Sequence, residues 1–339
     1  MAKKKYDAAV TFVAGCVIEK DYVYLAAKLD SLDIEDAYTR IFIFDGAKGD
    51  SNWVLHDLAD WEVVSVGVAS SVTPRLYCSL SKDGNVRLEY VGGELVEEIV
   101  DAGLSTGDVD KYGYVSKIRE IGNHLYVCGL SGQVYRREGG IWKHFDENLL
   151  RPVIDFAQRI ERINSGDMSD FDSLFDDALA LNDVNGIDES DIYTVGDSGK
   201  IFHFDGKDWS QVECGIDEIL LCIKCVSRDE VWICGYNGAL LKGNWKKGFV
   251  DVSGVDDNDV YSSVEVFKDV VYLASETGLS IFNGNKIQRL KTGLVPEIFD
   301  GNLLESKDGV LWSFGFKDIA FYDGTEWTRV PFPDNPPIR

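Results

Sequence analysis

The chain has 339 residues, of which 45% are hydrophobic and 12% aromatic, so it can bury a large core. It carries 58 acidic and 34 basic side chains, which gives a formal net charge of −24. A field of that sign repels phosphate backbones, which argues against nucleic acid as a direct ligand, and it favours fast encounter with a basic protein. No apolar stretch is long enough to cross a membrane as a helix.

The first residues, Met1–Lys5, precede an apolar run that ends at Cys16 and so resemble the start of a lipoprotein signal. The apolar core of such a signal would be short, and it would contain Asp7. We therefore expect this run to form the first strand of the fold, and we expect a cytoplasmic protein. The seven cysteines fall mostly in predicted strands, where we expect small, buried, reduced side chains.

One aromatic position recurs along the chain, at intervals close to 40 residues in the C-terminal half. Its occurrences are Tyr24, Tyr77, Tyr126, Tyr193, Trp232, Tyr272 and Trp312. Each is followed by a glycine-centred turn, such as Asp205-Gly206, of the kind that joins two short antiparallel strands. A period near 40 residues built from short strands is typical of propeller blades. The sequence therefore predicts an all-β, seven-bladed β-propeller, a single domain over residues 1–339.

Residues 188–213 show the repeat most clearly, with three strands expected at 192–196, 200–204 and 209–212. An aromatic residue, a glycine-rich turn, a second aromatic, Asp-Gly and a tryptophan follow one another in this unit, and residues 308–330 repeat the order. This pattern resembles the bacterial propeller repeats grouped with WD40, YVTN and BNR-like domains. The resemblance implies a fold, and it does not specify an activity.

In chain order, the repeat divides the sequence into blades separated by short connections. The expected blades are 8–64, 65–103, 113–150, 183–214, 215–256, 257–294 and 295–334. Each chain end supplies a complete blade, so the sequence does not require a strand to be exchanged at the closure and leaves the manner of closure open. The tail, Pro331–Arg339, contains four prolines, so it is expected to be an extended strap or a disordered end.

The interval between Tyr126 and Tyr193 is too long for one blade, which predicts an insertion at 151–182. Its apolar residues recur at helical spacing, with Pro152 suited to a first turn and Ser169 to an N-cap. We therefore expect a helical hairpin between blades three and four. The side of its second helix opposite the apolar stripe would be acidic.

That acidic side, together with the nearby Asp188 turn, is the candidate binding surface for a basic partner. The candidate residues are Asp170, Phe171, Asp172, Asp176, Asp177, Asp188, Glu189 and Asp191. The alternative is a cap that packs its apolar stripe on the propeller and leaves a solvated acidic face. Propellers of this repeat type are similar to immunity proteins of polymorphic toxin systems. This resemblance implies a non-enzymatic monomer that neutralises a basic antibacterial toxin domain by direct binding.

The sequence offers no constellation typical of catalysis or metal binding. The four histidines have no metal-ligand spacing, and Cys222 and Cys225 would point to opposite faces of a strand. The acidic loop that begins at Asp108 has Arg119 where a calcium loop needs glutamate. We therefore predict no catalytic residue, no cofactor and no metal. A glycan-binding or glycoside-hydrolysing propeller, or a general protein-interaction scaffold, remains the alternative, because the sequence does not show which acids line the channel.

Overall fold

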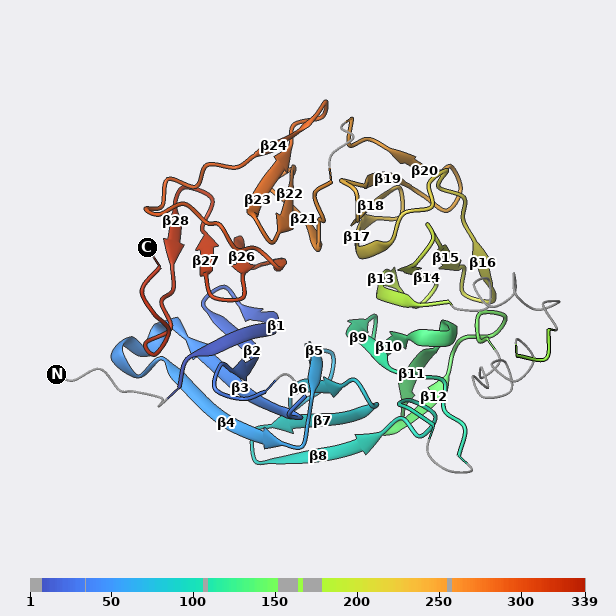
Figure 1. Cartoon of the computed structure of the whole chain (residues 1–339), viewed down its shortest axis with the longest axis horizontal. Helices are drawn as coiled ribbons and strands as arrows, with labels where there is room; N and C mark the ends of the chain where they lie inside the picture. Colours follow the sequence, from blue (N-terminus) through green and yellow to red (C-terminus); the bar gives the residue numbers. More distant parts are fainter. Residues whose placement is uncertain are drawn as a thin grey trace.

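The computed structural model describes residues 8–33, 35–105, 109–151, 164–166, 179–254 and 258–338. In these ranges the strands form seven antiparallel sheets of four strands each. The sheets are arranged as a ring around a central channel, and the first and last sheets lie side by side (Figure 1). The predicted seven-bladed propeller is confirmed.

The first four blades follow the chain in order. They comprise β1 (Val10–Glu19), β2 (Tyr22–Leu29), β3 (Tyr38–Asp45) and β4 (Trp53–Ala59); β5 (Val63–Ala69), β6 (Leu76–Ser81), β7 (Asn85–Tyr90) and β8 (Gly93–Glu98); β9 (Val115–Ile121), β10 (His124–Gly129), β11 (Val134–Glu138) and β12 (Ile141–His144); and β13 (Leu181–Asp188), β14 (Asp191–Gly196), β15 (Ile201–Phe204) and β16 (Trp209–Gln211). Two short 3₁₀ helices, η1 (Gly46–Ser51) and η2 (Leu130–Gly132), lie in connections.

The last three blades complete the ring. They comprise β17 (Leu220–Ser227), β18 (Glu230–Gly235), β19 (Leu240–Asn244) and β20 (Gly248–Asp251); β21 (Ser263–Phe267), β22 (Val270–Ser275), β23 (Gly278–Phe282) and β24 (Ile287–Arg289); and β25 (Leu303–Lys307), β26 (Val310–Phe314), β27 (Ile319–Tyr322) and β28 (Trp327–Arg329). In every blade the first strand is innermost and the fourth is outermost (Figure 1).

The recurring aromatic residues all lie on the second strand of their blade. Second strands are buried on both faces by the neighbouring blades, so their sequences are largely apolar. The aromatic side chain combines a large apolar body with a polar tip that can reach the next blade. Tyr24 Oη lies 2.9 Å from Ser79 Oγ, and Tyr193 Oη accepts the backbone N–H of Trp245 at 3.1 Å.

The innermost strands are held to one another by side chains that accept backbone N–H groups from the next blade. Ser65 accepts from Ile118, Asp183 from Ile223, and Ser263 from Leu304, at 3.0–3.2 Å. Glu305 of the last blade accepts from Val17 of the first at 2.9 Å. The same contact therefore continues across the position where the ring closes.

The closure joins two complete blades without strand exchange. Phe12 donates its backbone N–H to Phe316 O at 2.9 Å, and Trp312 Nε1 donates to Lys20 O at 3.0 Å. The C-terminal tail is an ordered strap over this seam. Phe332 packs in the blade-one core, 5.0 Å from Phe42 between ring centroids, and Asn335 bonds both backbone polar groups of Val10.

The prediction of a helical hairpin is corrected by the structure. The regular elements that the structure describes are strands and two 3₁₀ helices, with no α-helical element. The predicted helical insertion extends to residue 182, but Leu181 is the first residue of β13. Leu179 and Leu181 are both buried in the same core cluster, and that spacing of two is the period of a strand. Residues 152–163 and 167–178, the rest of the predicted hairpin, lie outside the described residues.

Candidate functional site

The two faces of the ring are built from different connections, because the strands of every blade alternate in direction. We call the face with the first-to-second and third-to-fourth strand connections the turn face. Its connections are residues 20–21, 46–52, 70–75, 91–92, 122–123, 139–140, 189–190, 205–208, 228–229, 245–247, 268–269, 283–286, 308–309 and 323–326. Most are tight turns.

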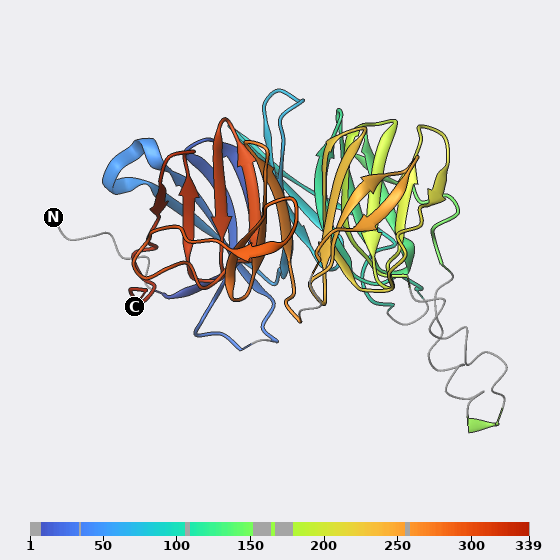
Figure 2. The same cartoon turned by 90° about the horizontal axis from the view of Figure 1, so that it is seen from above.

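We call the opposite face the loop face. Its connections are residues 30–37, 60–62, 82–84, 99–114, 130–133, 145–180, 197–200, 212–219, 236–239, 252–262, 276–277, 290–302 and 315–318, together with the tail 330–338. Figure 2 shows the ring edge-on, with the 70–75 connection at the top on the turn face and the 30–37 connection at the bottom on the loop face.

The charge of the molecule is distributed unequally between these faces. Among the described side chains, the turn-face connections carry nine Asp and Glu and nine Lys and Arg. The loop-face connections carry twenty-one Asp and Glu against six Lys and Arg. The turn face is thus close to neutral, whereas the loop face is strongly acidic.

Some loop-face carboxylates serve the fold, and others are free to meet a partner. Asp318 is buried and accepts two bonds from Arg329, at 2.7 and 2.9 Å. Glu147, Glu213 and Asp217 are exposed, and their side chains make no ion pair with another described residue. These three carboxylates, at blades three to five, are a free acidic surface.

Exposed apolar side chains accompany the acids on the loop face. Those exposed by more than a third are Leu32, Val100, Leu104, Val109, Leu130, Tyr236, Val295 and Phe299. Phe299 is 50% exposed although it follows the buried Ile298. Apolar anchors inside a charged rim are typical of protein-binding surfaces.

Five of the eight residues predicted from sequence as the binding surface are not described by the structure. Asp170, Phe171, Asp172, Asp176 and Asp177 lie outside the described residues.

Asp188 and Glu189 lie at the turn-face end of β13, where both have partners. Asp188 bonds Ser190 and Arg228, and Glu189 bonds His124 and the backbone N–H of Asn123. Asp191 is fully buried and lies 2.8 Å from His203 Nε2.

The insertion joins the propeller at the other face. Arg151 donates its backbone N–H to Ser131 O at 2.7 Å, and Leu179 O accepts from Gly132 at 2.8 Å. Both attachments are at the loop-face end of the blades, and β13 then runs across the blade to Asp188. Eight residues of strand span roughly 25 Å. The attachment points of the insertion and the Asp188 turn therefore belong to opposite faces.

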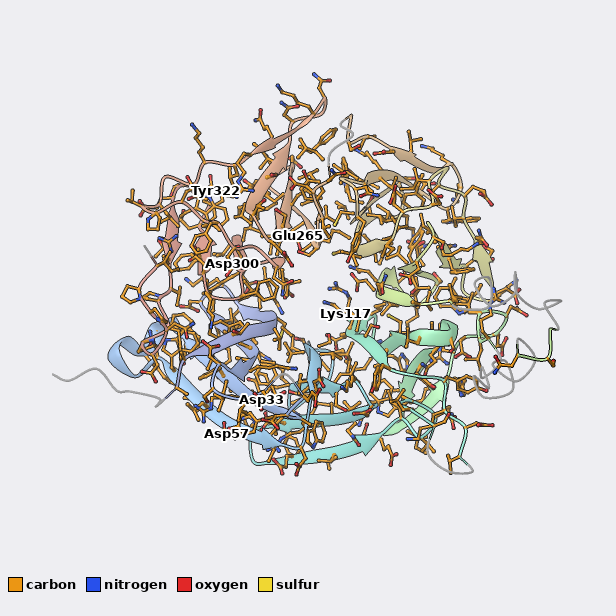
Figure 3. All side chains as sticks on the ribbon, in the orientation of Figure 1. Asp33, Asp57, Lys117, Glu265, Asp300 and Tyr322 are labelled. Atoms are coloured by element: carbon orange, nitrogen blue, oxygen red, sulfur yellow. The ribbon has the colours of Figure 1, made fainter. Side chains whose placement is uncertain are left out.

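The central channel contains the residues that sequence reasoning missed. It holds a cavity of about 290 Å³ lined by side chains of the innermost strands, including Lys117, Arg119, Lys224, Glu265 and Glu305. Figure 3 places Lys117 and Glu265 at the edge of the central opening. The sequence does contain a signal for these channel residues, because charged residues at alternate positions, such as Lys117 and Arg119, are unusual inside a closed β-fold.

Most of the charged groups in the channel are paired. Arg119 makes two bonds to Asp183, at 3.1 and 3.0 Å, and Lys224 lies 2.7 Å from Glu265. Burial works against the charge of Asp183, but Arg119 and Lys117 outweigh it and lower the pKa of Asp183. Burial raises the pKa of Glu305, whose carboxylate also accepts the Val17 N–H.

The residue types that bind metal ions do not gather into a site in the described parts of the chain. No group of three or more His, Cys, Asp or Glu side chains is placed to hold a metal ion there. The seven cysteines are buried and free. Cys222 and Cys225 belong to different core clusters, as their spacing on one strand predicted.

A second cavity, of about 430 Å³, lies on the turn face between blades one and two. It is lined by Tyr22, Tyr77, Asp21 and other residues of these blades. Tyr22 and Tyr77 meet edge to face, 6.4 Å apart between centroids. This cavity brings aromatic side chains and carboxylates together at the surface.

Comparison with solved structures gives the architecture. The WD40 β-propeller domain of Doa1 matches with a TM-score of 0.60 and 9% identity, over 95% of each chain. YCF48, in a structure bound to D1 peptide, matches with a TM-score of 0.61 and 11% identity, over 93% of this chain and 92% of that one. The chain is a seven-bladed β-propeller repeat protein.

The propeller also has a similar sequence among characterised proteins. It is 28% identical to the immune protein Tsi7 of Pseudomonas aeruginosa over 334 residues, which is 96% of this chain and 99% of that protein. No protein-family model matches the propeller. Among the described residues, no helix is long and apolar enough to cross a membrane.

Proposed function

We propose that this propeller is an immunity protein, which protects its cell by binding a cognate antibacterial toxin without catalysing a reaction. The observation that carries the proposal is the end-to-end similarity to the immune protein Tsi7. Because the similarity covers almost the whole of both chains, it includes the blades and the connections between them. The propeller fold supports the proposal, since its loops form a broad rigid surface of the kind that binds proteins.

We place the toxin on the loop face. The excess of carboxylates there would attract a basic toxin domain and orient it before contact. Phe299, Val295 and Leu104 supply exposed apolar area within that charged surface. The turn face is close to neutral, and its Asp188 and Glu189 are already bonded within the propeller.

The function is tested by protection of living cells. The partner is first isolated with the tagged propeller as bait from the native organism, with washes at low and high salt. A toxin recovered in stoichiometric amount is then expressed in a sensitive host with and without the propeller. We expect restored growth and complete inhibition of the purified toxin at a 1:1 ratio. Growth arrest despite a folded, expressed propeller would contradict the proposal.

One observation favours a second candidate function, the binding of a glycan. The turn-face cavity holds Tyr22 and Tyr77 beside carboxylates, and sugars bind by stacking on aromatic rings and bonding to carboxylates. Glu19 is paired with Arg75 at 2.9 Å, so the cavity has both charge signs. Retention on a glycan array by the wild-type protein, and loss of retention in Tyr77→Ala, would support this function. An array without any bound sugar would remove it.

A further inference from the structure

Two of the seven cysteines lie directly opposite each other on the two inner strands of blade five. Cys222 on β17 is the cross-strand partner of Cys234 on β18, and both side chains belong to the same core cluster. Directly opposite residues of an antiparallel pair have Cα atoms about 4.5 or 5.5 Å apart. Both spacings fall within the range of about 4.4–6.8 Å that separates the Cα atoms of a disulfide. The backbone of blade five therefore holds these two cysteines at disulfide spacing.

The side chains of the pair also meet. Cys222 Sγ lies 3.9 Å from Ser263 Oγ, and Cys234 Sγ donates to Tyr261 O at 3.2 Å, so both sulfur atoms contact the same short segment of blade six. A bond between the two thiols lowers the pKa of Cys222. Burial and then the same bond raise the pKa of Cys234 well above its usual range. The two thiols thus lie on one side of blade five and interact with each other.

This arrangement is specific to one pair of cysteines. The other cysteines in the described strands face residues of other types: Cys16 faces Tyr24, Cys78 faces Gly67 and Leu88, Cys128 faces Lys117 and Val134, and Cys225 faces Val231. Cys214 lies in the connection 212–219. Cys225 is buried on the same strand as Cys222 but packs in a different core cluster, which makes it a matched control.

The two thiols differ in access and in reactivity. Cys222 lines the channel cavity of about 290 Å³, whereas Cys234 is fully buried on the second strand. A cavity of that volume admits a small oxidant, since one water occupies about 30 Å³. The thiolate is the reactive form of cysteine, and the bond from Cys234 favours the Cys222 thiolate more than burial disfavours it. Cys222 is therefore the thiol that meets an oxidant first, and Cys234 is the thiol placed to react with it next.

We propose that Cys222 and Cys234 are a modification site, which hydrogen peroxide converts to a reversible disulfide. The Cys222 thiolate attacks one peroxide oxygen, the O–O bond breaks, and hydroxide leaves and takes up the proton that Cys222 released. This step leaves a sulfenic acid on Cys222. The Cys234 sulfur then attacks the Cys222 sulfur, the S–O bond breaks, and the departing hydroxide leaves as water with the Cys234 proton. The two thiols together lose two electrons, which the peroxide gains. The site does not depend on the proposed function.

The test is thiol counting and peptide mapping after the purified, folded full chain is treated with hydrogen peroxide. The count of free thiols, measured in denaturant, should fall from seven to five, because two of them are joined. The linked peptides should contain Cys222 and Cys234, and a thiol reductant should restore all seven. Retention of all seven thiols, loss of thiols without a linkage, or a disulfide between any other two cysteines would overturn the proposal.

Serine variants assign the role of each thiol. Cys234→Ser should form no disulfide and should accumulate a sulfenic acid on Cys222, which dimedone traps. Cys222→Ser should leave Cys234 at least about tenfold less reactive toward peroxide than Cys222 is in the wild type. Cys225→Ser should form the disulfide at the wild-type rate, and loss of the linkage in this control would overturn the assignment. If a serine variant does not fold, the linkage mapped in the wild-type protein decides.

Discussion

The turn face and the loop face differ in charge, in connection length and in structural role. The turn face consists mostly of two- to four-residue turns, whereas the loop face carries the long connections, the tail and most of the unbalanced carboxylates. The loop-face connections also contain buried polar side chains that hold the blades in place, among them Gln133, Asp146 and Asp300. The loop face therefore presents most of the unbalanced charge and carries the tail across the seam, whereas the turn face is close to neutral and consists mostly of tight turns.

The largest effect is expected where the tail crosses the seam. Phe332→Ala should lower the free energy of unfolding by about 3–5 kcal/mol, because the phenyl group of Phe332 fills a core shared with Phe12, Phe42 and Trp53. Phe299→Ala, at an exposed loop-face position, should change it by less than about 0.5 kcal/mol. Urea denaturation measures both. Similar values for the two variants would mean that the tail does not hold the ring closed.

A smaller loss is expected at a buried loop-face anchor. Asp146 accepts the backbone N–H of Val134 at 3.1 Å and lies 2.9 Å from His144 Nδ1. Asp146→Ala should cost about 2–3 kcal/mol of stability, since it leaves a buried donor without a partner. Asp208→Ala, at an exposed turn-face position, is the matched control and should cost less than about 0.5 kcal/mol. A large loss in the control would show that the turn face is structural as well.

The contributions of His144 and His203 to the stability of the fold should depend on pH with opposite signs. Burial tends to lower the pKa of His144, but Asp146 and Asp101 outweigh it and raise that pKa. The stabilisation from His144 is therefore fully present below about pH 6.5 and is lost as the pH rises through the raised value. Burial lowers the pKa of His203 more than Asp191 raises it. The stabilisation from the neutral, buried His203 is therefore present above about pH 6.5 and is lost as the pH falls below that value.

Urea denaturation of the corresponding glutamine variants between pH 5.5 and 8 separates the two effects. The loss caused by His144→Gln should shrink as the pH rises, and the loss caused by His203→Gln should grow. Parallel curves for wild type and both variants would contradict the assigned environments.

Much of the fold could be predicted because the second, third and fourth strands of each blade repeat clear signals. Tyr193, Gly199 and Trp209 mark one blade, and their counterparts mark the others. Apart from β1, which is the strand expected from the N-terminal apolar run, the innermost strands were not recognised. Residues such as Lys117, which lines the channel, and the buried Asp183 interrupt their apolar pattern. The prediction of a helical hairpin was wrong, because it extended the helical spacing of the insertion as far as Leu181, which belongs to strand β13.

The candidate site was harder to predict, because the face on which an acid lies depends on counting strands correctly. Without β13, Asp188 and the insertion appear to be neighbours, although β13 places the Asp188 turn and the insertion's attachment points on opposite faces. The burial of Asp191 depends on contact with His203 on another strand. No local pattern in the sequence contains that information.

The central claim is that a basic toxin docks on the loop face, and the most direct test compares charge reversal on the two faces. The loop-face variant combines Glu147→Lys, Glu213→Lys and Asp217→Lys. The control combines Asp208→Lys, Asp229→Lys and Glu326→Lys on the turn face, with the same change in net charge. All six side chains are exposed.

The association rate with the isolated toxin is measured at low and high salt. The loop-face variant should associate about tenfold more slowly at low salt, and the difference should shrink at high salt, because steering by surface charge is screened. The turn-face control should associate at close to the wild-type rate. Equal slowing by both variants, or slowing by the turn-face variant alone, would contradict docking on the loop face.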